Sequence, residues 1–363
     1  MKTNKFLIGF LLQATVCSSG LHAQTDLHAN AYSIIQDAVT DIVCTSPTDA
    51  IQKEKRVIQI LDGKGKGDAS FVCMCDRFSS LKKFSGEVRD ASGNVIRKIK
   101  KSELKVTEYS DELVSDDYYY FFEYTPSRYP ITITYEWEIK NSDGLIGYPS
   151  FLPQKNYNQS VAQTSYRILT PADNPCRYRT INMQAEVSQK QTTDGNWLTE
   201  VKVQSLPAIQ KEPYSPALSE LLPRIYFTPR NFSFEGTKGS MDNWQTYGAW
   251  QYQLLSGRDQ IPPALKEELQ RRTANCNTPY EKIAAVYQYL ASTTRYVSIQ
   301  LGIGGLQPIA AADVHRTGFG DCKGLSNYMR AMLTELGIPS TYTVISTTTV
   351  SYTHLTLPTK LEV

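Results

Sequence analysis

The stretch Gly318-Phe319-Gly320-Asp321-Cys322-Lys323-Gly324 opens the segment that decides the fold. After it, apolar residues recur three and four positions apart, which places them on one face of a helix. These residues are Leu325, Tyr328, Met329, Met332, Leu333 and Leu336. Gly337 suits a helix end and Pro339 cannot continue a helix, so the pattern predicts a buried helix that begins at Cys322 and a strand-like segment over 338–345.

The position of Cys322 at the helix start favours a reactive thiolate. The first turn of a helix presents unpaired N–H groups and a partial positive charge, and both stabilise the ionised sulfur of a group whose ordinary pKa is about 8.5. Gly318 and Gly320 leave room around the sulfur, and nearby N–H groups can stabilise an oxyanion. The alternative is a small buried hydrophobic side chain that happens to begin a helix.

Several motifs around this helix resemble the core of bacterial transglutaminase-like proteins. They are Gly320-Asp321-Cys322-Lys323, the helix over 327–336, Gly337-Ile338-Pro339, and Thr294-Arg295-Tyr296-Val297 leading to Gly302 and Pro308. Residues 245–347 resemble that core. Residues 50–215 resemble the β-rich domain of unknown function that commonly precedes it in exported bacterial proteins.

The resemblance implies a papain-like α+β core in which Cys322 is the nucleophile, followed in the chain by a histidine base and an aspartate that orients it. We expect no cofactor and no metal. One position departs from the pattern, because Gly324 stands where many relatives carry aspartate. Asp321 can cap the helix, but its carboxylate would raise the pKa of the neighbouring thiol unless Lys323 offsets it.

The N-terminus predicts a secretory signal peptide over residues 1–23. Lys2 and Lys5 precede an apolar run over 6–16 that is too short to span a membrane, and Ala23 offers a small residue at the cut. We therefore expect an exported protein, periplasmic or at the cell surface. A lipoprotein would use Cys17, whose preceding residues fit that signal poorly.

Charge argues against a polyanionic partner. The chain has 38 basic and 36 acidic residues, and removal of Lys2 and Lys5 with the signal would leave 36 of each. The basic cluster over 97–101 fits a solvated strand face, so no nucleic-acid partner is expected. No later apolar run is long enough for a membrane helix. The oligomeric state is left open.

Six cysteines follow the predicted signal: Cys44, Cys73, Cys75, Cys176, Cys276 and Cys322. If Cys322 stays free, five cysteines are left, and an odd number of cysteines cannot all form disulfides within one chain. Cys73 and Cys75 should point to one face of a strand. Packed strand cysteines or one disulfide elsewhere are favoured over a metal site, since few histidines are available as further ligands.

The C-terminus from Thr347 lacks the strand pattern that the resemblance implies. It resembles translated sequencing-adapter read-through, so we expect a truncated chain with a non-native tail over 348–363. His354 follows Cys322 by 32 positions, but no Asp or Asn comes after it, and only Glu362 could orient its ring. We therefore do not assign His354 as the catalytic base.

Residues before the core predict a β-rich domain. An N-terminal extension over 24–50 should contain a short helix over 31–43, and an antiparallel β-sandwich-like domain should cover 51–206. The turn at 90–94 joins two strands into a hairpin, and alternating apolar residues over 131–139 predict another strand. The aromatic residues of 118–137 are interpreted as core rather than as a surface stacking platform.

Prolines over 207–224 predict a linker, followed by an incomplete transglutaminase-like core over 225–347. Within it we expect a helix over 244–255, one starting at Pro263, and one whose Thr278 and Glu281 form a capping box. That last helix should pack beside the Cys322 helix, and the loop from 296 to 308 should form one wall of the cleft. Tyr287 and Tyr296 are both candidates to assist an oxyanion.

Two functions are compatible with these sequence features. The first is cysteine-dependent acyl transfer or hydrolysis at amide bonds of peptides or proteins, through a Cys-His-Asp triad of which this chain retains only the cysteine. The second is a non-catalytic exported binding or scaffold protein built on an inactive core. A cysteine without a base is a poor acyl-transfer catalyst, so we expect a catalytically incompetent chain and an active parent protein.

Overall fold

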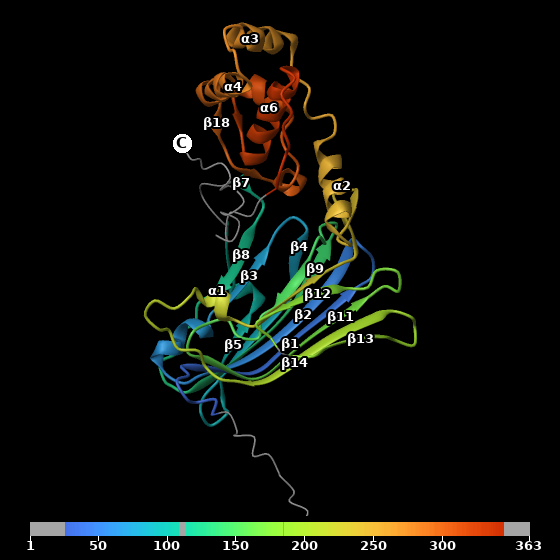
Figure 1. Cartoon of the computed structure of the whole chain (residues 1–363). Coiled ribbons are helices and arrows are strands. Elements are labelled where there is room, and N and C mark those ends of the chain that lie inside the picture. The colour runs from blue at the N-terminus through green and yellow to red at the C-terminus, as the bar shows by residue number, and fades with distance from the viewer. Residues whose placement is uncertain (1–25, 109–113, 184, 345–363) are drawn as a thin grey trace, which may run out of the picture.

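A computed structural model describes residues 26–108, 114–183 and 185–344. The chain forms a β-rich sheet region followed by an α+β region that carries the helices (Figure 1). The central element is an eight-stranded sheet. Its strands, in spatial order, are β13 (Val187–Gln191), β14 (Trp197–Leu206), β11 (Gln159–Thr170), β1 (Ser33–Cys44), β2 (Asp49–Ile60), β9 (Ile131–Ser142), β4 (Ser79–Arg89) and β5 (Val95–Lys100).

Neighbouring strands of this sheet are antiparallel except for β1 and β11, which run parallel. Apolar residues alternate with polar ones along β9, and every second residue from Ile131 to Ile139 is buried. Because successive side chains of a strand point to opposite faces, these residues mark the buried face of the sheet. The predicted hairpin is confirmed as β4 and β5, which pair from Ser85↔Lys100 to Arg89↔Val95.

Two smaller sheets cover the buried face. One contains β3 (Phe71–Cys75), β8 (Tyr118–Phe122) and β6 (Lys105–Glu108), and the other contains β10 (Tyr148–Phe151), β15 (Arg224–Thr228) and β12 (Arg177–Ile181). Phe71 packs within 5.3 Å, ring centre to ring centre, of Tyr135 and Trp137 of β9. Tyr166 of β11 stacks on Phe227 of β15 at 4.6 Å. Aromatic residues of 118–137 therefore lie largely in or against the core, as expected.

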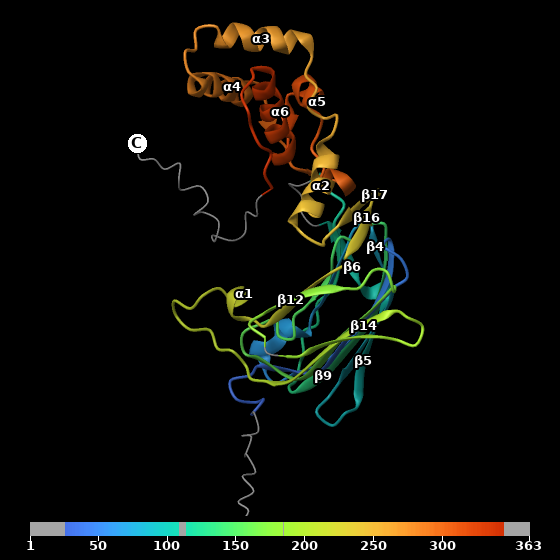
Figure 2. The same ribbon diagram turned by 45° about the vertical axis from the view of Figure 1, so that its right-hand side comes forward.

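The helices gather at one end of the molecule (Figures 1 and 2). They are α2 (Trp244–Leu255), α3 (Pro263–Thr273), α4 (Pro279–Thr293), α5 (Ala311–Thr317) and α6 (Cys322–Glu335), while the short α1 (Leu218–Leu221) lies beside the sheets. The capping box at Thr278 and Glu281 and the packing of α4 against α6 are both confirmed. Tyr328, Met332 and Leu333 of α6 are buried together with Leu269 of α3 and Val286 of α4.

Three contacts among the described residues help to join the two regions. The strands β7 (Val114–Ser115) and β19 (Ile299–Gln300) pair in parallel, and Phe78 contacts Phe234 at 4.7 Å between ring centres. Phe234 belongs to the hairpin of β16 (Asn231–Phe234) and β17 (Thr237–Ser240), which lies beside α2 (Figure 2). Ion pairs and hydrogen bonds around Arg77 and Glu235 make the third connection.

Two expectations about secondary structure and one about a domain boundary are wrong. Residues 33–44 form strand β1 and not a helix, because the strand pairs on both sides inside the large sheet. Residues 338–344 form no strand, since a strand needs a neighbour and none is described for this segment. Strand β15 belongs to the sheet region and not to the core, because Ile225 and Phe227 are buried against that region.

None of the described helices is long and apolar enough to span a membrane. The predicted signal peptide, Cys17, His354 and the tail over 348–363 lie outside the described residues.

Candidate active site

Cys322 is the first residue of α6, and its side chain is exposed to solvent. The chain reaches it through a tight turn after α5, in which Gly318 adopts the left-handed conformation with φ of 68°. The short strand β20 (Phe319–Gly320) then pairs with β18 (Arg295–Tyr296). The cysteine is therefore held between a paired strand and a helix start rather than on a free loop. The alternative of a small buried core residue does not fit this exposure.

Asp321 caps α6. Its Oδ1 accepts a hydrogen bond from the Gly324 N–H at 2.9 Å, and its side chain forms an ion pair with Lys323. Asp321 is only 1% exposed, so its charge needs a partner to offset the cost of desolvation. The sequence left open whether Asp321 caps the helix or whether Lys323 balances its charge, and the structure contains both interactions.

The N–H groups of Cys322 and Lys323 donate to no described acceptor. Gly324 donates to the Asp321 side chain and Leu325 donates to the Asp321 carbonyl, so those two groups are occupied. Free N–H groups at a helix start favour negative charge. The Cys322 and Lys323 N–H groups can therefore stabilise both a thiolate and an oxygen that gains charge beside it.

The loop before α5 lies against the start of α6. A Cβ placed on Gly324 would lie 3.3 Å from the Ile309 Cβ, which is a tight contact. Further along α6, Asn327 donates to the Arg258 carbonyl at 2.8 Å, and Arg258 donates to the Pro308 carbonyl at 3.3 Å. The expected wall formed by this loop thus packs directly on the helix that carries the cysteine.

Of the two candidate tyrosines, only Tyr296 is held beside the cysteine loop. Tyr296 pairs with Gly320 in the β18–β20 ladder, and the Val297 N–H donates to the Gly320 carbonyl at 3.0 Å. Tyr287 lies on the exposed surface of α4. The backbone pairing therefore favours Tyr296 over Tyr287 as a neighbour of the site.

No described histidine contacts Cys322. His315 of α5 lies 3.1 Å from the Tyr328 hydroxyl through its Nδ1. Tyr328 follows Cys322 by six residues, which is about 240° around an α-helix, so this pair belongs to another face of α6. Burial raises the pKa of the Tyr328 phenol. His315 thus acts as a packing partner of a buried tyrosine in the described structure.

A second feature near Cys322 was missed by sequence reasoning. A groove of about 440 Å³ lies between α2 and residues 340–344. Tyr342 lines it, and burial raises the pKa of the Tyr342 phenol to about 12, with smaller contributions in the same direction from Cys322 and Asp321. Tyr342 therefore lies close enough to the cysteine and its neighbour for their charges to interact. No motif in the sequence marks this groove, because its two walls lie some 90 positions apart.

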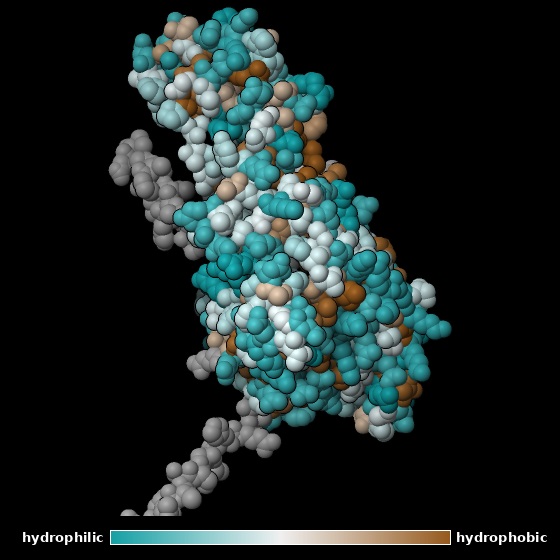
Figure 3. Space-filling model, turned by 90° about the vertical axis from the view of Figure 1, so that its right-hand side faces the viewer, coloured by the Kyte–Doolittle hydropathy of each residue, from teal (hydrophilic) through white to brown (hydrophobic). Residues whose placement is uncertain are grey.

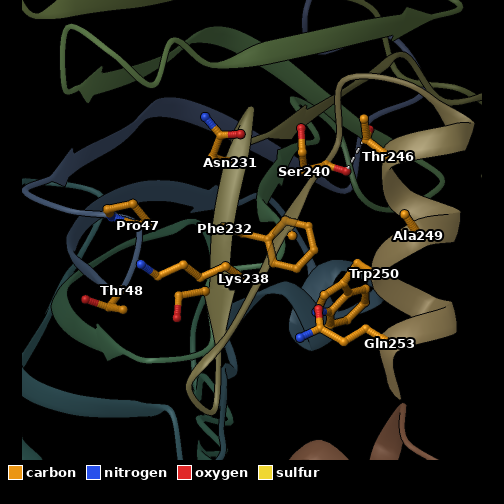
Figure 4. Close-up of a pocket in the computed structure, with 12 residues that line it drawn as sticks. Pro47, Thr48, Asn231, Phe232, Lys238, Ser240, Thr246, Ala249, Trp250 and Gln253 are labelled. Carbon is orange, nitrogen blue, oxygen red and sulfur yellow. Dashed lines mark hydrogen bonds between the residues drawn. The ribbon is translucent and has the colours of Figure 1, made fainter. Parts of the chain in front are cut away.

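The opposite face of α2 lines a larger cavity of about 680 Å³ (Figure 4). Phe232 of β16 and Trp250 of α2 meet there edge to face, with ring centres 4.8 Å apart. Thr246 donates to the Ser240 carbonyl at 3.3 Å and closes one side. The cavity lies between α2, the β16–β17 hairpin and the β1–β2 turn at Pro47 and Thr48.

The other cysteines differ from Cys322 in burial. Cys44, Cys73, Cys75 and Cys176 are buried, and Cys276 is partly exposed. Burial raises the pKa of the Cys44 thiol to about 11 and that of Cys176 to about 12. Cys73 and Cys75 share one face of β3, as predicted. In the described part of the chain, no cluster of three or more His, Cys, Asp or Glu side chains suits a metal ion.

Comparison with known proteins agrees with this arrangement. Residues 50–210 match a domain described as "Domain of Unknown Function with solved-structure structure (DUF3857)", and residues 267–354 match the transglutaminase-like superfamily. The chain therefore contains a DUF3857 domain followed by a transglutaminase-like core. This confirms the resemblance seen in the sequence and the order of its two parts.

Among solved structures, the chain is similar to a "putative protease" from Parabacteroides distasonis ATCC 8503, with a TM-score of 0.61 and 14% identity. The match covers 85% of this chain and 59% of that chain, so this chain spans about three-fifths of the length of its relative. At this identity the likeness concerns the fold. An M1 zinc metallopeptidase from Deinococcus radiodurans matches with a TM-score of only 0.28 and 9% identity, over 64% of this chain and 54% of that chain. No curated protein matches.

Proposed function

We propose that the natural protein to which this chain belongs is a cysteine-dependent enzyme that transfers or hydrolyses acyl groups at amide bonds of peptides or proteins, with Cys322 as nucleophile. The observation that carries the proposal is the exposed sulfur at the first residue of α6, beside two N–H groups without described acceptors. The transglutaminase-like core and the fold of the Parabacteroides distasonis relative support the same class of chemistry.

In the proposed reaction the Cys322 thiolate attacks the carbonyl carbon of the amide. The carbonyl oxygen gains charge, which the free N–H groups at the helix start stabilise. The C–N bond breaks, the amine leaves with a proton, and the acyl group remains on sulfur as a thioester. Water then releases a carboxylic acid and restores the thiol, or a second amine takes the acyl group. We favour water as the acceptor.

Proton transfer in this reaction requires a general base. The family resemblance implies a histidine and an aspartate after Cys322 in the chain, and His315 is engaged on another face of α6. We therefore propose that the base is a histidine that follows Cys322 in the natural protein and is not His354.

The test uses the protein expressed from its natural gene and a mixture of peptides as amide substrates. Cys322→Ala should abolish the release of new amino groups, and intact mass should show an acyl adduct on the unmodified protein only. Cys276→Ala is the matched control, because Cys276 is the other described cysteine that is not buried. Equal turnover by the Cys322→Ala variant would refute the nucleophile. Absence of turnover in the unmodified protein, together with stable capture of a peptide, would favour the scaffold function.

We also propose that the protein is exported, to the periplasm or the cell surface. The basic start, the apolar run over 6–16 and Ala23 support this proposal. N-terminal sequencing of the protein from its natural host should give a mature chain that begins at Gln24. A mature protein that retains Met1 would contradict export through this signal.

A further inference from the structure

Helix α2 carries one aromatic residue that the described protein buries and two that it leaves exposed. Trp250 is 2% exposed and packs against Phe232. Trp244 is 84% exposed and Tyr252 is 70% exposed, and both line the groove beside the Cys322 region. Large aromatic side chains left exposed along a groove are typical of a binding surface.

From the shape and chemistry of this groove, we propose that it binds an aromatic or large apolar side chain of the substrate whose amide Cys322 attacks. The inference rests on the proposed function and specifies its substrate class. The groove has a volume of about 440 Å³. Its lining residues are Trp244, Tyr247, Gly248, Gln251, Tyr252, Leu255, Arg330 and residues 340–344.

The spacing along α2 leaves a gap, here called the slot, at Gly248 between two aromatic positions. Trp244, Gly248 and Tyr252 follow one another four residues apart and therefore share one face of the helix. Gly248 stands midway between the two aromatic residues, and a Cβ built on it would meet no atom within 4 Å. The missing side chain leaves open space between Trp244 and Tyr252 that a flat or branched apolar group can fill.

Helix geometry does not require glycine at this position. Gly248 is not among the residues with positive φ, and glycine in a helix interior is less favourable than alanine by about 1 kcal/mol. Glycine at position 248 therefore has a cost for the helix. The open space that it leaves in the groove explains why a glycine stands there.

The residues that line the groove favour an apolar side chain of the substrate over an acidic one. Arg330 of α6 is the only charged residue among those that line it. Its Nη2 forms an ion pair with Asp259 at 3.2 Å and donates to the Asn327 side chain at 3.3 Å, so a carboxylate already faces its charge, while its buried Nε has no partner among the described residues. Figure 3 shows the face that carries α2, where pale, near-neutral side chains lie between the helical region and the more hydrophilic surface of the sheets.

The groove lies within reach of the nucleophile. Arg330 follows Cys322 by eight residues on α6, which corresponds to about 12 Å along the helix axis. An extended peptide covers that distance in about four residues. The side chain held in the groove therefore belongs to a residue within about four positions of the attacked amide.

The test measures alkylation of Cys322 by tripeptide chloromethyl ketones, in which a C–S bond forms and chloride leaves. One probe is triglycine, and the others carry a single phenylalanine at each position in turn. On the full chain, one phenylalanine probe should label Cys322 about tenfold faster than triglycine, as expected for burial of part of an aromatic side chain. Intact mass and peptide mapping give the rate at each cysteine.

Variants at Gly248 then test the slot itself. Gly248→Leu should fill the slot and remove the preference for phenylalanine, whereas Gly248→Ala should keep most of it. Trp244→Ala should weaken the preference by removing one wall without filling the space. Iodoacetamide, which is too small to need the groove, should label Cys322 at the same rate in all of these variants.

The outcomes separate this inference from the proposed function. A preference that Gly248→Leu leaves intact, or no preference at any position, overturns the groove as a substrate site even if amide turnover is observed. A preference for a phenylalanine probe that depends on residue 248 supports the groove as a substrate site. If the natural protein also turns over no amide, only the proposed catalysis is refuted.

Discussion

Asp321 and Lys323 form an ion pair on the two sides of Cys322 while Asp321 also caps α6. We predict that Asp321→Ala destabilises the protein by about 2 to 4 kcal/mol, because it removes the cap and leaves the nearly buried Lys323 unpaired. Urea unfolding measures the difference. Asp313→Ala is the control, since its ion pair with Arg316 is exposed and should contribute less than about 1 kcal/mol. Equal effects of the two substitutions would refute the structural role of Asp321.

Cysteine reactivity should follow burial. We predict that iodoacetamide labels Cys322 first, Cys276 more slowly, and the four buried cysteines only after unfolding. Mass spectrometry of tryptic peptides at successive times checks the order. Labelling of Cys322 that persists well below the pH at which Cys276 loses reactivity would indicate that the helix start activates the sulfur. Rapid labelling of Cys44 or Cys176 in the folded protein would contradict the packing of the sheet region.

Burial of Cys44 predicts a specific pH dependence of stability. Its thiol pKa rises from 9.0 to about 11 on folding, so between these values the folded protein keeps a proton that the unfolded chain releases. The free energy of unfolding is therefore unaffected by this thiol below pH 9. It falls by about 2 to 3 kcal/mol as the pH rises towards 11. Cys44→Ala should flatten that part of the profile relative to the unmodified protein, and Cys276→Ala should not. Identical profiles for all three proteins would contradict the burial.

The helix that carries Cys322 could be predicted because its apolar residues face a single core. Strand β1 could not be predicted. Its ladder with β2 shifts register between Ile35 and Asp37, and this bulge places Ile35, Ala38 and Ile42 on the same face of the strand. The resulting pattern of apolar residues matches helical spacing although the segment is a strand.

The groove beside Cys322 was invisible in the sequence for a related reason. Trp244, Tyr247, Trp250 and Leu254 form one stripe by spacing, which is usually buried together. In the structure, Phe232 of the β16–β17 hairpin packs against Trp250, and Trp250 and Leu254 are buried while Trp244 remains exposed. Which residues of a stripe are covered depends on a neighbour that the local pattern does not specify.

Glu235 connects the sheet region to the core. Its carboxylate contacts Arg77 at 3.0 Å and accepts a hydrogen bond from the Ile303 N–H at 3.0 Å. Glu235 also has a positive φ of 42°, a conformation that glycine adopts without cost and that costs other residues about 1 kcal/mol. Two contributions to stability therefore oppose each other at this residue.

Glu235→Gly separates these contributions. If the turn conformation dominated, the substitution would stabilise the protein by about 1 kcal/mol. We predict instead a loss of about 1 to 2 kcal/mol in urea unfolding, because hydrogen bonds to charged groups contribute about 1.5 to 3 kcal/mol and two partners lose the carboxylate. Lys238→Ala on the same hairpin is the control, since Lys238 is exposed and forms no ion pair with a described residue. A more stable Glu235→Gly variant would mean that the contact with Arg77 and Ile303 does not hold the two regions together.

Gly302 packs directly against the contact between Arg77 and Glu235. Its N–H donates to Asp116 at 3.1 Å, and a Cβ at this position would lie 2.5 Å from both the Arg77 guanidinium and the Glu235 carboxylate. Its φ of 50° adds a backbone penalty for any other residue. Gly302→Ala should therefore destabilise the junction by about 2 kcal/mol or more, measured by urea unfolding. Gly304→Ala two residues later meets no atom within 4 Å and should change stability by less than about 0.5 kcal/mol. Similar losses at both glycines would show that loop flexibility, rather than the Arg77–Glu235 contact, sets the requirement at residue 302.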